Sequence, residues 1–342
     1  MPGPVAEDPH HRPPDEIVGL ALRAPHGVIT LDAAKDAGLE RKELAALVRR
    51  GVLVRVAPGA FVVGEEWRCA DAERRHVLQA TAKVLLLGGR VALSHVSAAA
   101  FFRLPLLTPP GHRVHLVRTT PGSGRSRADF VVHRPYGLGA LHAGVETKAV
   151  PAVVPVLAAF GVAELRGFVA GVVALDAALH TRLTTREDVE DWLGRLERRP
   201  LVRLLHRVSS AADASCESPL ETQVRLLLVS LGYEVVSQRV LRTEAGEFVA
   251  RVDLYLPELG VVVEVDGRGK YRAEDGSGST ASVLSEKRRE KAIVDLGYGV
   301  VRVEHADLER PAQIDQRIAG AAARVDRSRI PLLSRGGDSC GA

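Results

Sequence analysis

The sequence predicts a multidomain protein of the α+β or α/β class. Residues 15–65 show three short helical patterns followed by a hairpin, and residues 218–315 run in the order helix, strand, strand, strand, helix, strand. Residues 66–210 mix both patterns, and 342 residues are enough for two or three cores. The remaining segments are expected to be a disordered leader, a small-residue linker and a disordered tail, at residues 1–14, 211–217 and 330–342.

Composition argues against a secreted or membrane-spanning protein. The chain has 46 basic and 42 acidic side chains, so a nucleic-acid-binding function would need local clustering of charge. Cys69, Cys216 and Cys340 are widely spaced, which favours a reducing compartment over a disulfide framework or a zinc site. The N-terminus lacks the apolar stretch of a signal peptide. The longest apolar region, residues 149–165, contains two prolines and is too short to span a membrane. We therefore expect a cytoplasmic protein without a membrane partner.

The first unit begins with the helical segment DEIVGLAL, which Pro25 and Gly27 end. Thr30 is a suitable N-cap for a second short helix, and Gly38 closes that helix. A third helix is expected at residues 40–50. Two apolar runs, VLVRV and AFVV, then flank the turn sequence APG, which indicates a small hairpin.

The third helix of this unit has a leucine-rich face and an opposite basic face. Three helices followed by a hairpin make the winged-helix arrangement, in which the third helix enters the major groove of duplex DNA and the hairpin contacts its backbone. Winged helices also serve as plain protein-interaction modules. The residues expected to contact DNA are Arg41, Lys42 and Arg49 on the helix and Arg55 on the wing.

The middle region is expected to contain strands at residues 113–118 and 129–134, and helices near 70–86, 153–160, 167–180, 185–196 and 199–208. Ser94 is a suitable cap for a short helix that begins after it. His95 lies between Ser94 and Ser97, but no acid or second nucleophile sits at a motif spacing. We therefore expect His95 to be a structural, hydrogen-bonded histidine.

Several stretches of this part resemble AbiEi-type antitoxins. They are the helical unit with its wing, the segment ALSHVSAAAFFRLPL, the two strands and the LDAAL helix, and the resemblance covers about residues 15–210. It implies a winged helix that binds promoter DNA and a following region that supports DNA binding or regulation. It also raises a toxin as a partner protein.

The stretch RVDLYLPELGVVVEVDG, residues 251–267, reads as a hairpin. A four-residue connection at 257–260 would pair residue 256 with residue 261. In this register Val252 faces Val265 and one face of the hairpin is wholly apolar. A slip of one residue would scatter these apolar side chains, so the pattern itself favours the register.

The other face of this hairpin gathers acids. Asp253 would lie directly opposite Glu264, and Asp266 would lie diagonally from Asp253. Carboxylates about 5 Å apart on a largely buried face repel one another, and a divalent cation would neutralise them. Mg²⁺ or Mn²⁺ bound there would support phosphodiester hydrolysis by a metal-activated water. The sequence predicts a metal site at Asp253 and Glu264, with Glu221 and Asp266 as further ligands.

The segments RVDLYLPE, VVVEVDG and EKRREKAIVDLGYGVVRV resemble PD-(D/E)XK nucleases, and among them the very-short-patch repair endonucleases, over about residues 215–310. The resemblance implies a restriction-endonuclease-like fold in which Asp253 and Glu264 bind the metal and Glu221 is the acid of the first helix. Asp266 stands where the general pattern has a lysine. The catalytic cation is therefore open between Lys270 and Lys287, and Lys287 is favoured because a helix holds it.

Arg288 and Arg289 continue this helix and belong to a basic rim that would attract DNA. Structural alternatives remain, because Glu221 would complete a capping box with Ser218 and Asp253 would form an ion pair with Arg251 or another arginine. The sequence thus predicts a DNA-binding protein with an Mg²⁺-dependent endonuclease domain. The alternative is a non-catalytic DNA-binding regulator or antitoxin with a vestigial nuclease fold.

Overall fold

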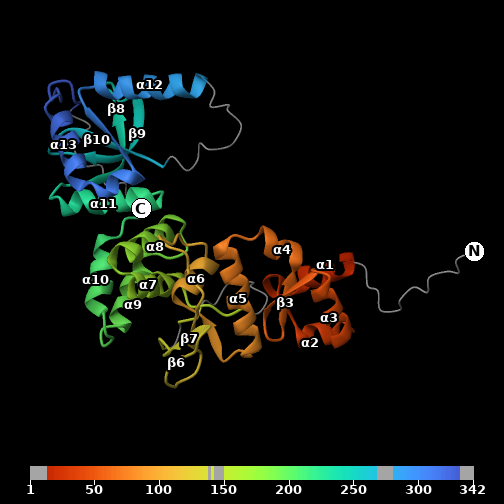
Figure 1. Ribbon diagram of the computed structural model, residues 1–342. Helices are drawn as coiled ribbons and strands as arrows, with labels where there is room; N and C mark the ends of the chain where they lie inside the picture. Colours follow the sequence, from red (N-terminus) through yellow and green to blue (C-terminus); the bar gives the residue numbers. More distant parts are fainter. Residues whose placement is uncertain (1–13, 138–139, 142–149, 268–279, 332–342) are drawn as a thin grey trace, which may run out of the picture. The chain divides into compact units, whose positions relative to one another are not determined.

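The computed structural model describes residues 14–137, 140–141, 150–267 and 280–331. The chain is of mixed α/β class and divides into two units (Figure 1). Unit 1 comprises Met1–Ala178 and Leu183–Ser209, and unit 2 comprises Leu179–Arg182 and Ser210–Ala342. None of the helices in the described ranges is long and apolar enough to cross a membrane. Residues 1–13 and 332–342 of the predicted leader and tail lie outside these ranges, as does Lys270.

Unit 1 begins with three helices and a small antiparallel sheet of order β1-β3-β2. Thr30 caps the second helix as predicted, since its hydroxyl accepts the N–H of Ala33 at 3.2 Å. Gly59 adopts a φ of 90° in the turn between β2 and β3, where other residues would be strained. The elements are α1 (Pro14–Arg23), a 3₁₀ turn (Pro25–Gly27), β1 (Ile29–Thr30), α2 (Leu31–Asp36), α3 (Arg41–Arg49), β2 (Leu53–Ala57) and β3 (Ala60–Val63).

Apolar burial fixes α3 against this sheet. Leu44 and Leu47 are buried and pack in one cluster with Ile17, Ile29 and Phe61. Burying a leucine side chain contributes about 1.5–3 kcal/mol, so the rotation of α3 about its axis is strongly determined. The predicted leucine-rich face of the third helix is therefore confirmed.

The rest of unit 1 has a four-stranded sheet of order β4-β5-β7-β6, in which β5 and β7 are parallel. The sequence patterns do not predict β4, since it is only three residues long. The elements are α4 (Gly64–Cys69), α5 (Ala72–Leu86), β4 (Val91–Leu93), α6 (His95–Phe101), β5 (Val114–Arg118), β6 (Arg125–Ser126), β7 (Phe130–His133), α7 (Pro155–Arg166), α8 (Phe168–His180), α9 (Arg186–Arg195) and α10 (Val202–Ala211).

Helices α6 and α7 approach each other closely at Gly161. A Cβ atom on Gly161 would lie 2.6 Å from the Cα of His95, closer than real side chains come. His95 itself has a φ of 50°, which is strained for a residue other than glycine. The contact therefore requires glycine at position 161.

Unit 2 follows the predicted order of helix, three strands, helix and strand, and one more helix comes after it. Its sheet has the order β11-β10-β9-β8, and β10 and β11 are parallel. The elements are α11 (Pro219–Ser230), β8 (Val236–Arg242), β9 (Phe248–Leu256), β10 (Val261–Asp266), α12 (Thr280–Asp295), β11 (Gly299–Glu304), a 3₁₀ turn (His305–Glu309) and α13 (Pro311–Ala322).

Helices cover both faces of this sheet (Figure 1). Apolar residues of α11 and α13 form one core with Leu254, Leu256 and Val263. Ile293 of α12 belongs to a second core with Val262. Because side chains alternate along β10, Glu264 shares the α12 face with Val262.

The predicted hairpin register is confirmed where residues 261, 262 and 263 pair with 256, 255 and 254. The prediction that Val252 belongs to the same apolar face is wrong. Val252 packs in the α12 core, whereas Leu254 packs in the α11 core. The cause is Asp253, whose carboxylate accepts the N–H of Val265 at 2.8 Å in place of a bond between the strands.

The neighbouring pairing of β8 with β9 skips one pair at the same position. It passes from residues 237 and 254 to 239 and 252 without a change of register, and its register shift comes later, between Leu241 and Arg242. Gln238, at the skipped pair, has a φ of 53°. Asp253 therefore lies opposite a residue whose backbone departs from the extended conformation.

Replacing Gly161 with alanine tests the close contact of α6 and α7. We expect Gly161→Ala to lower the free energy of unfolding by about 1–3 kcal/mol, because the new methyl group must displace His95 or α7. Urea denaturation followed by circular dichroism measures this change.

The matched control is Gly194→Ala. Gly194 lies in α9, and a Cβ added there meets no atom within 4 Å. This variant should be unchanged or stabilised by up to about 1 kcal/mol, because alanine favours a helix. If both variants were equally stable, the close contact at Gly161 would not constrain the fold.

Candidate functional site

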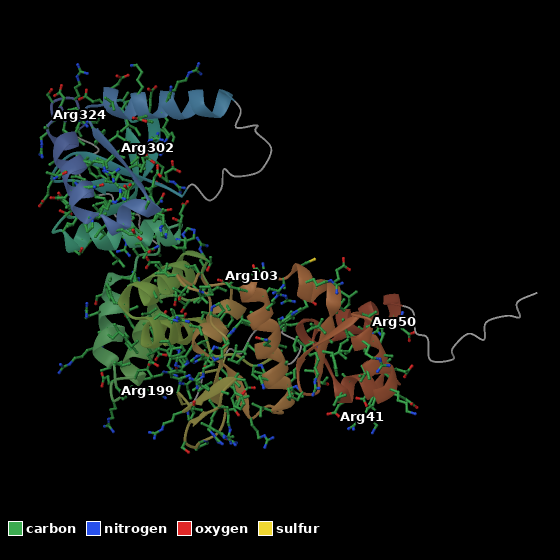
Figure 2. All side chains as sticks on the ribbon, in the orientation of Figure 1. Arg41, Arg50, Arg103, Arg199, Arg302 and Arg324 are labelled. Atoms are coloured by element: carbon green, nitrogen blue, oxygen red, sulfur yellow. The ribbon has the colours of Figure 1, made fainter. Side chains whose placement is uncertain are left out.

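The exposed face of α3 carries a basic group in unit 1. Arg41, Lys42 and Arg49 are all exposed and lie within about 100° of one another around the helix axis. Figure 2 labels Arg41 on this helix. The first turn is held by a capping box, in which the backbone N–H of Glu40 donates to the carboxylate of Glu43 at 2.7 Å. The structure thus brings the three predicted helix residues onto one face.

Arg55 projects from strand β2 of the hairpin and is also exposed. Its Nε donates to the carbonyl oxygen of Ala57 at 3.4 Å, so the side chain lies along the hairpin. In unit 1 all four predicted DNA-contacting residues are therefore accessible.

In unit 2, Glu264 is paired with a cation from α12. The Nη2 of Arg289 donates to both carboxylate oxygens of Glu264, at 2.8 and 3.0 Å, and to the carbonyl oxygen of Arg251 at 3.0 Å. The Glu264 side chain is 13% exposed and that of Arg289 is 35% exposed. The sequence predicts that Arg289 belongs to a basic rim that attracts DNA. In the structure its guanidinium pairs with Glu264.

Asp253 is the second acid of this group. Its carboxylate accepts the N–H of Val265. Burial raises the pKa of Asp253, the hydrogen bond from Val265 lowers it, the charge of Glu221 raises it and that of Arg289 lowers it, so that the net shift is upward. Glu221 and Arg289 therefore both lie within electrostatic reach of Asp253. Of the alternative partners considered for Asp253, Arg251 instead pairs with Glu217 at 2.8 Å.

Glu221 reaches the group from α11, on the other face of the sheet. Its Oε2 accepts the N–H of Glu217 and the side-chain amide of Gln238, each at 2.9 Å. Ser218 caps α11 as predicted, since its hydroxyl accepts the N–H of Glu221 at 3.2 Å. In a capping box the carboxylate of Glu221 would accept the N–H of Ser218, but here it accepts the N–H of Glu217.

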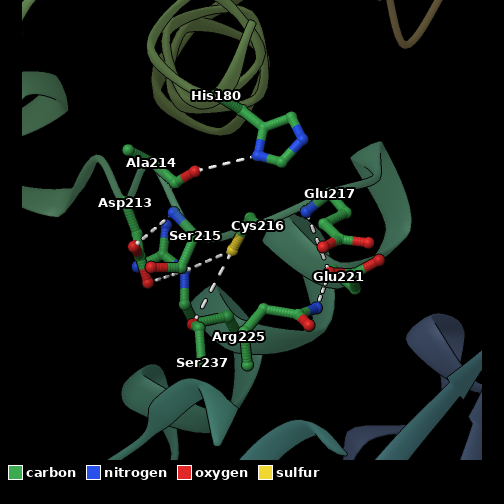
Figure 3. A network of polar contacts seen from close by, with 10 residues as sticks. His180, Asp213, Ala214, Ser215, Cys216, Glu217, Glu221, Arg225 and Ser237 are labelled. Carbon is green, nitrogen blue, oxygen red and sulfur yellow. Dashed lines mark hydrogen bonds and ion pairs between the residues drawn. The ribbon is translucent and has the colours of Figure 1, made fainter. Parts of the chain in front are cut away.

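A further polar network lies beside the start of α11 (Figure 3). Arg225 donates from Nε to the sulfur of the buried Cys216 at 3.2 Å, and Ser237 lies 3.8 Å from the same sulfur. Burial alone would raise the pKa of Asp213, but hydrogen bonds from Ser237 and Ser215 and the charge of Arg225 hold it below its usual value. This network joins the residues before α11 to α11 and β8, which is a structural role that the sequence does not indicate.

The remaining predicted site residues are not brought to these acids by any contact in the described ranges. Lys287 is exposed and lies about 200° around α12 from Arg289. Arg288 is also exposed. Asp266 is half-buried and pairs in register with Glu304 of β11. Lys270 lies outside the described residues.

As the side chains stand, the acids do not fit a divalent metal. Mg²⁺ needs carboxylate oxygens that converge on one point, and Glu221 and Glu264 approach from opposite faces of the sheet. Both oxygens of Glu264 accept bonds from Arg289. Across the described ranges, no three His, Cys, Asp or Glu side chains come close enough together to hold a metal ion.

Unit 1 contains a histidine cluster that the sequence does not indicate. His95 stacks on His133 with ring centroids 3.7 Å apart, and the Nδ1 of His115 lies 3.0 Å from the Nε2 of His133. His95 also contacts Ser94 at 3.0 Å and Glu164 at 3.2 Å. Ser94 is the N-cap residue of α6, as predicted, but its hydroxyl makes no helix-capping hydrogen bond.

The order Ser94, His95, Glu164 has the contacts of a catalytic triad. However, Ser94 is 0% exposed and His95 only 2%, so a substrate could not reach the hydroxyl. The cluster is therefore structural, in line with the role expected for His95. Burial, followed by the neighbouring histidines and arginines, lowers the pKa of His115 to about 4 and that of His133 to about 3.

Comparison with known proteins gives one family match. Residues 20–64 match the family described as "Transcriptional regulator, AbiEi antitoxin". These residues extend from α1 through α3 to the end of the hairpin, and they contain all four predicted DNA-contacting residues. The match supports a DNA-binding regulator.

Two proteins of Mycobacterium tuberculosis resemble most of the chain. Rv2248 of strain H37Rv and MT2308 of strain CDC 1551, both described as uncharacterized, are each 24% identical over 294 residues, which is 85% of this chain and 99% of theirs. The crystal structure of the RV2827C protein from Mycobacterium tuberculosis is 19% identical and covers 66% of this chain and 83% of its own. Its TM-score of 0.35 is too low to assign a common fold.

The histidine cluster predicts that the protein loses stability in mild acid. The folded-state pKa values of His115 and His133 lie below 6.5, so the unfolded chain binds protons that the folded chain does not. The contribution of these two histidines to the free energy of unfolding should therefore be fully present above pH 6.5 and should decrease as the pH falls towards 4. Urea denaturation at a series of pH values between 7.5 and 4.5 measures this slope.

Replacing His133 with glutamine should flatten the slope, whatever its effect on stability at pH 7.5. His112 is exposed, and His112→Gln is the matched control, with a slope like that of the wild type. An unchanged slope in His133→Gln would show that the cluster does not cause the acid sensitivity.

Proposed function

We propose that the chain is a DNA-binding transcriptional regulator of the AbiEi antitoxin type, and that residues 15–65 are its winged helix. One observation carries the proposal: the family match at residues 20–64 coincides with the part of unit 1 whose third helix exposes a basic face. The two facts support the proposal together, because exposed basic faces are common on helices and the family match covers only residues 20–64.

In this proposal α3 lies in the major groove of duplex DNA. Arg41 and Lys42 occupy the first turn of α3, the part of a recognition helix that reaches base edges. Arg49 ends the helix and Arg55 lies on the hairpin, where each would contact phosphate oxygens. The buried leucines fix the rotation of α3, and the capping box orders the turn that carries Arg41.

A mobility-shift assay with duplex DNA from upstream of the protein's own gene tests this proposal. The double variant Arg41→Ala with Lys42→Ala should bind at least about tenfold more weakly, which is about 1.4 kcal/mol. Arg49→Ala, which removes a phosphate contact in this proposal, should instead reduce the slope of log affinity against log salt concentration by about one.

Arg203→Ala is the matched control, since it removes an exposed arginine from α10, outside the matched residues. It should leave the affinity unchanged. If the double variant bound as tightly as the wild type, or if Arg203→Ala weakened binding equally, α3 would not be the DNA-contacting helix.

The antitoxin description of the matched family also raises a toxin partner. We propose that such a partner, if it is encoded beside this gene, forms a complex with this chain. Co-expression of the neighbouring gene with a tagged form of this chain, followed by purification, tests for that complex.

The endonuclease function of unit 2 stays a prediction from the sequence. The order of its elements supports a nuclease-like fold, but the pairing of Glu264 with Arg289 favours the non-catalytic alternative. Incubating plasmid and single-stranded DNA with the protein and Mg²⁺ or Mn²⁺ tests it. Cleavage by the wild type that both Asp253→Ala and Glu264→Ala abolish would support the enzyme.

A further inference from the structure

Glu264 and Asp253 of unit 2 are carboxylates with little access to water, and they therefore need a compensating positive charge. Glu264 is mostly buried on the α12 face of the sheet, with 13% of its side chain exposed, and Asp253 is half-buried beside it. Removing a carboxylate from water without a compensating positive charge destabilises the folded state. Something positive must therefore lie at Glu264 in the folded state.

The geometry at Glu264 identifies this positive charge. A single nitrogen, the Nη2 of Arg289, lies 2.8 Å from one carboxylate oxygen and 3.0 Å from the other. A nitrogen within hydrogen-bonding distance of both oxygens fills the approach between them, which a metal ion bound to both oxygens would also need. The guanidinium and a metal cannot both occupy that position.

The same nitrogen also ties three elements together. It donates to the carbonyl oxygen of Arg251 at 3.0 Å, so that the α12 residue holds β9 as well as β10. Next to it, the side chain of Arg251 pairs with Glu217. The positive charges of this group therefore come from its own chain.

We propose that Arg289 is the resident cation of the acid group in unit 2, occupying the position that a divalent metal would need at Glu264. The group is then an ion network that does not require metal, and Arg289 fastens α12 to the sheet. This inference goes beyond the DNA-binding function of unit 1 and does not depend on it.

Titration of the wild-type protein with Mn²⁺, followed by electron paramagnetic resonance, is the first test. We expect no site that is occupied at micromolar Mn²⁺, and no change of melting temperature when Mg²⁺ or Mn²⁺ is added. Tight binding of one Mn²⁺ that Glu264→Gln abolishes would overturn the proposal. This measurement needs no Arg289 variant, so it stays decisive if such variants fold poorly.

Variants of Arg289 provide the second test. Arg289→Gln should lower the melting temperature of unit 2 by about 4–8 °C, because Glu264 loses its counter-charge. Millimolar Mn²⁺ should recover part of this loss, since the vacated position then accepts a metal. Arg289→Lys keeps the charge and should lose less stability than Arg289→Gln.

Arg302→Gln is the matched control. Arg302 also joins the sheet to α12, since its Nη2 donates to Glu290 at 2.9 Å, but that acid is 46% exposed. Figure 2 labels Arg302. Because a solvent-exposed ion pair contributes little to stability, this variant should melt close to the wild type and should not respond to Mn²⁺.

An Arg289→Gln variant that melts like the wild type, or that shows no gain from Mn²⁺, would contradict the proposal. The mobility-shift assay reports on DNA binding by α3 in unit 1, whereas these tests report on metal binding and stability in unit 2. A failure of the DNA-binding proposal would therefore leave these outcomes unaffected, and the reverse also holds.

Discussion

The architecture of unit 2 depends on one hydrogen bond, from the N–H of Val265 to the carboxylate of Asp253. A side chain takes a backbone donor that would otherwise bind the neighbouring strand. The regular pairing of β9 and β10 therefore stops at residues 254 and 263, and Val252 turns towards the α12 core. Glu264 lies on the α12 face of the sheet and Glu221 approaches from α11, so the carboxylates at this end of the sheet do not share a single face.

This arrangement changes what the acids can do. Carboxylates that share one face would call for a shared cation, and a metal would suit them. Here each carboxylate has its own donors: a backbone N–H for Asp253, an amide and a backbone N–H for Glu221, and a guanidinium for Glu264. The same side chains that would bind Mg²⁺ in a hydrolase thus serve to hold helices on a sheet. Unit 1 then carries the best-supported function, because the family match includes α3 and its exposed basic face.

Much of the fold could be predicted from the sequence, because local patterns determine helices, caps and turns. The order of elements in unit 2, the cap at Thr30 and the two faces of α3 all follow from residue spacing. The partner of Glu264 could not be predicted, since Arg289 lies on a helix whose rotation against the sheet depends on packing. Likewise, His95, His133 and Glu164 lie far apart in the sequence and are brought together only by the fold, so their contacts could not be predicted from residue spacing.

Helix α13 was not expected, although Ile314 and Ile318 are buried in the same core as Leu254. After it, the N–H of Asp326 donates to the carbonyl oxygen of Gly297 at 2.9 Å, and Ile330 is buried. A shortened chain that stopped at residue 315, where the sequence patterns place the end of the domain, would lose Ile318 and expose the apolar residues that α13 covers beside α11. The smallest self-contained version of this unit must therefore extend at least through residue 330.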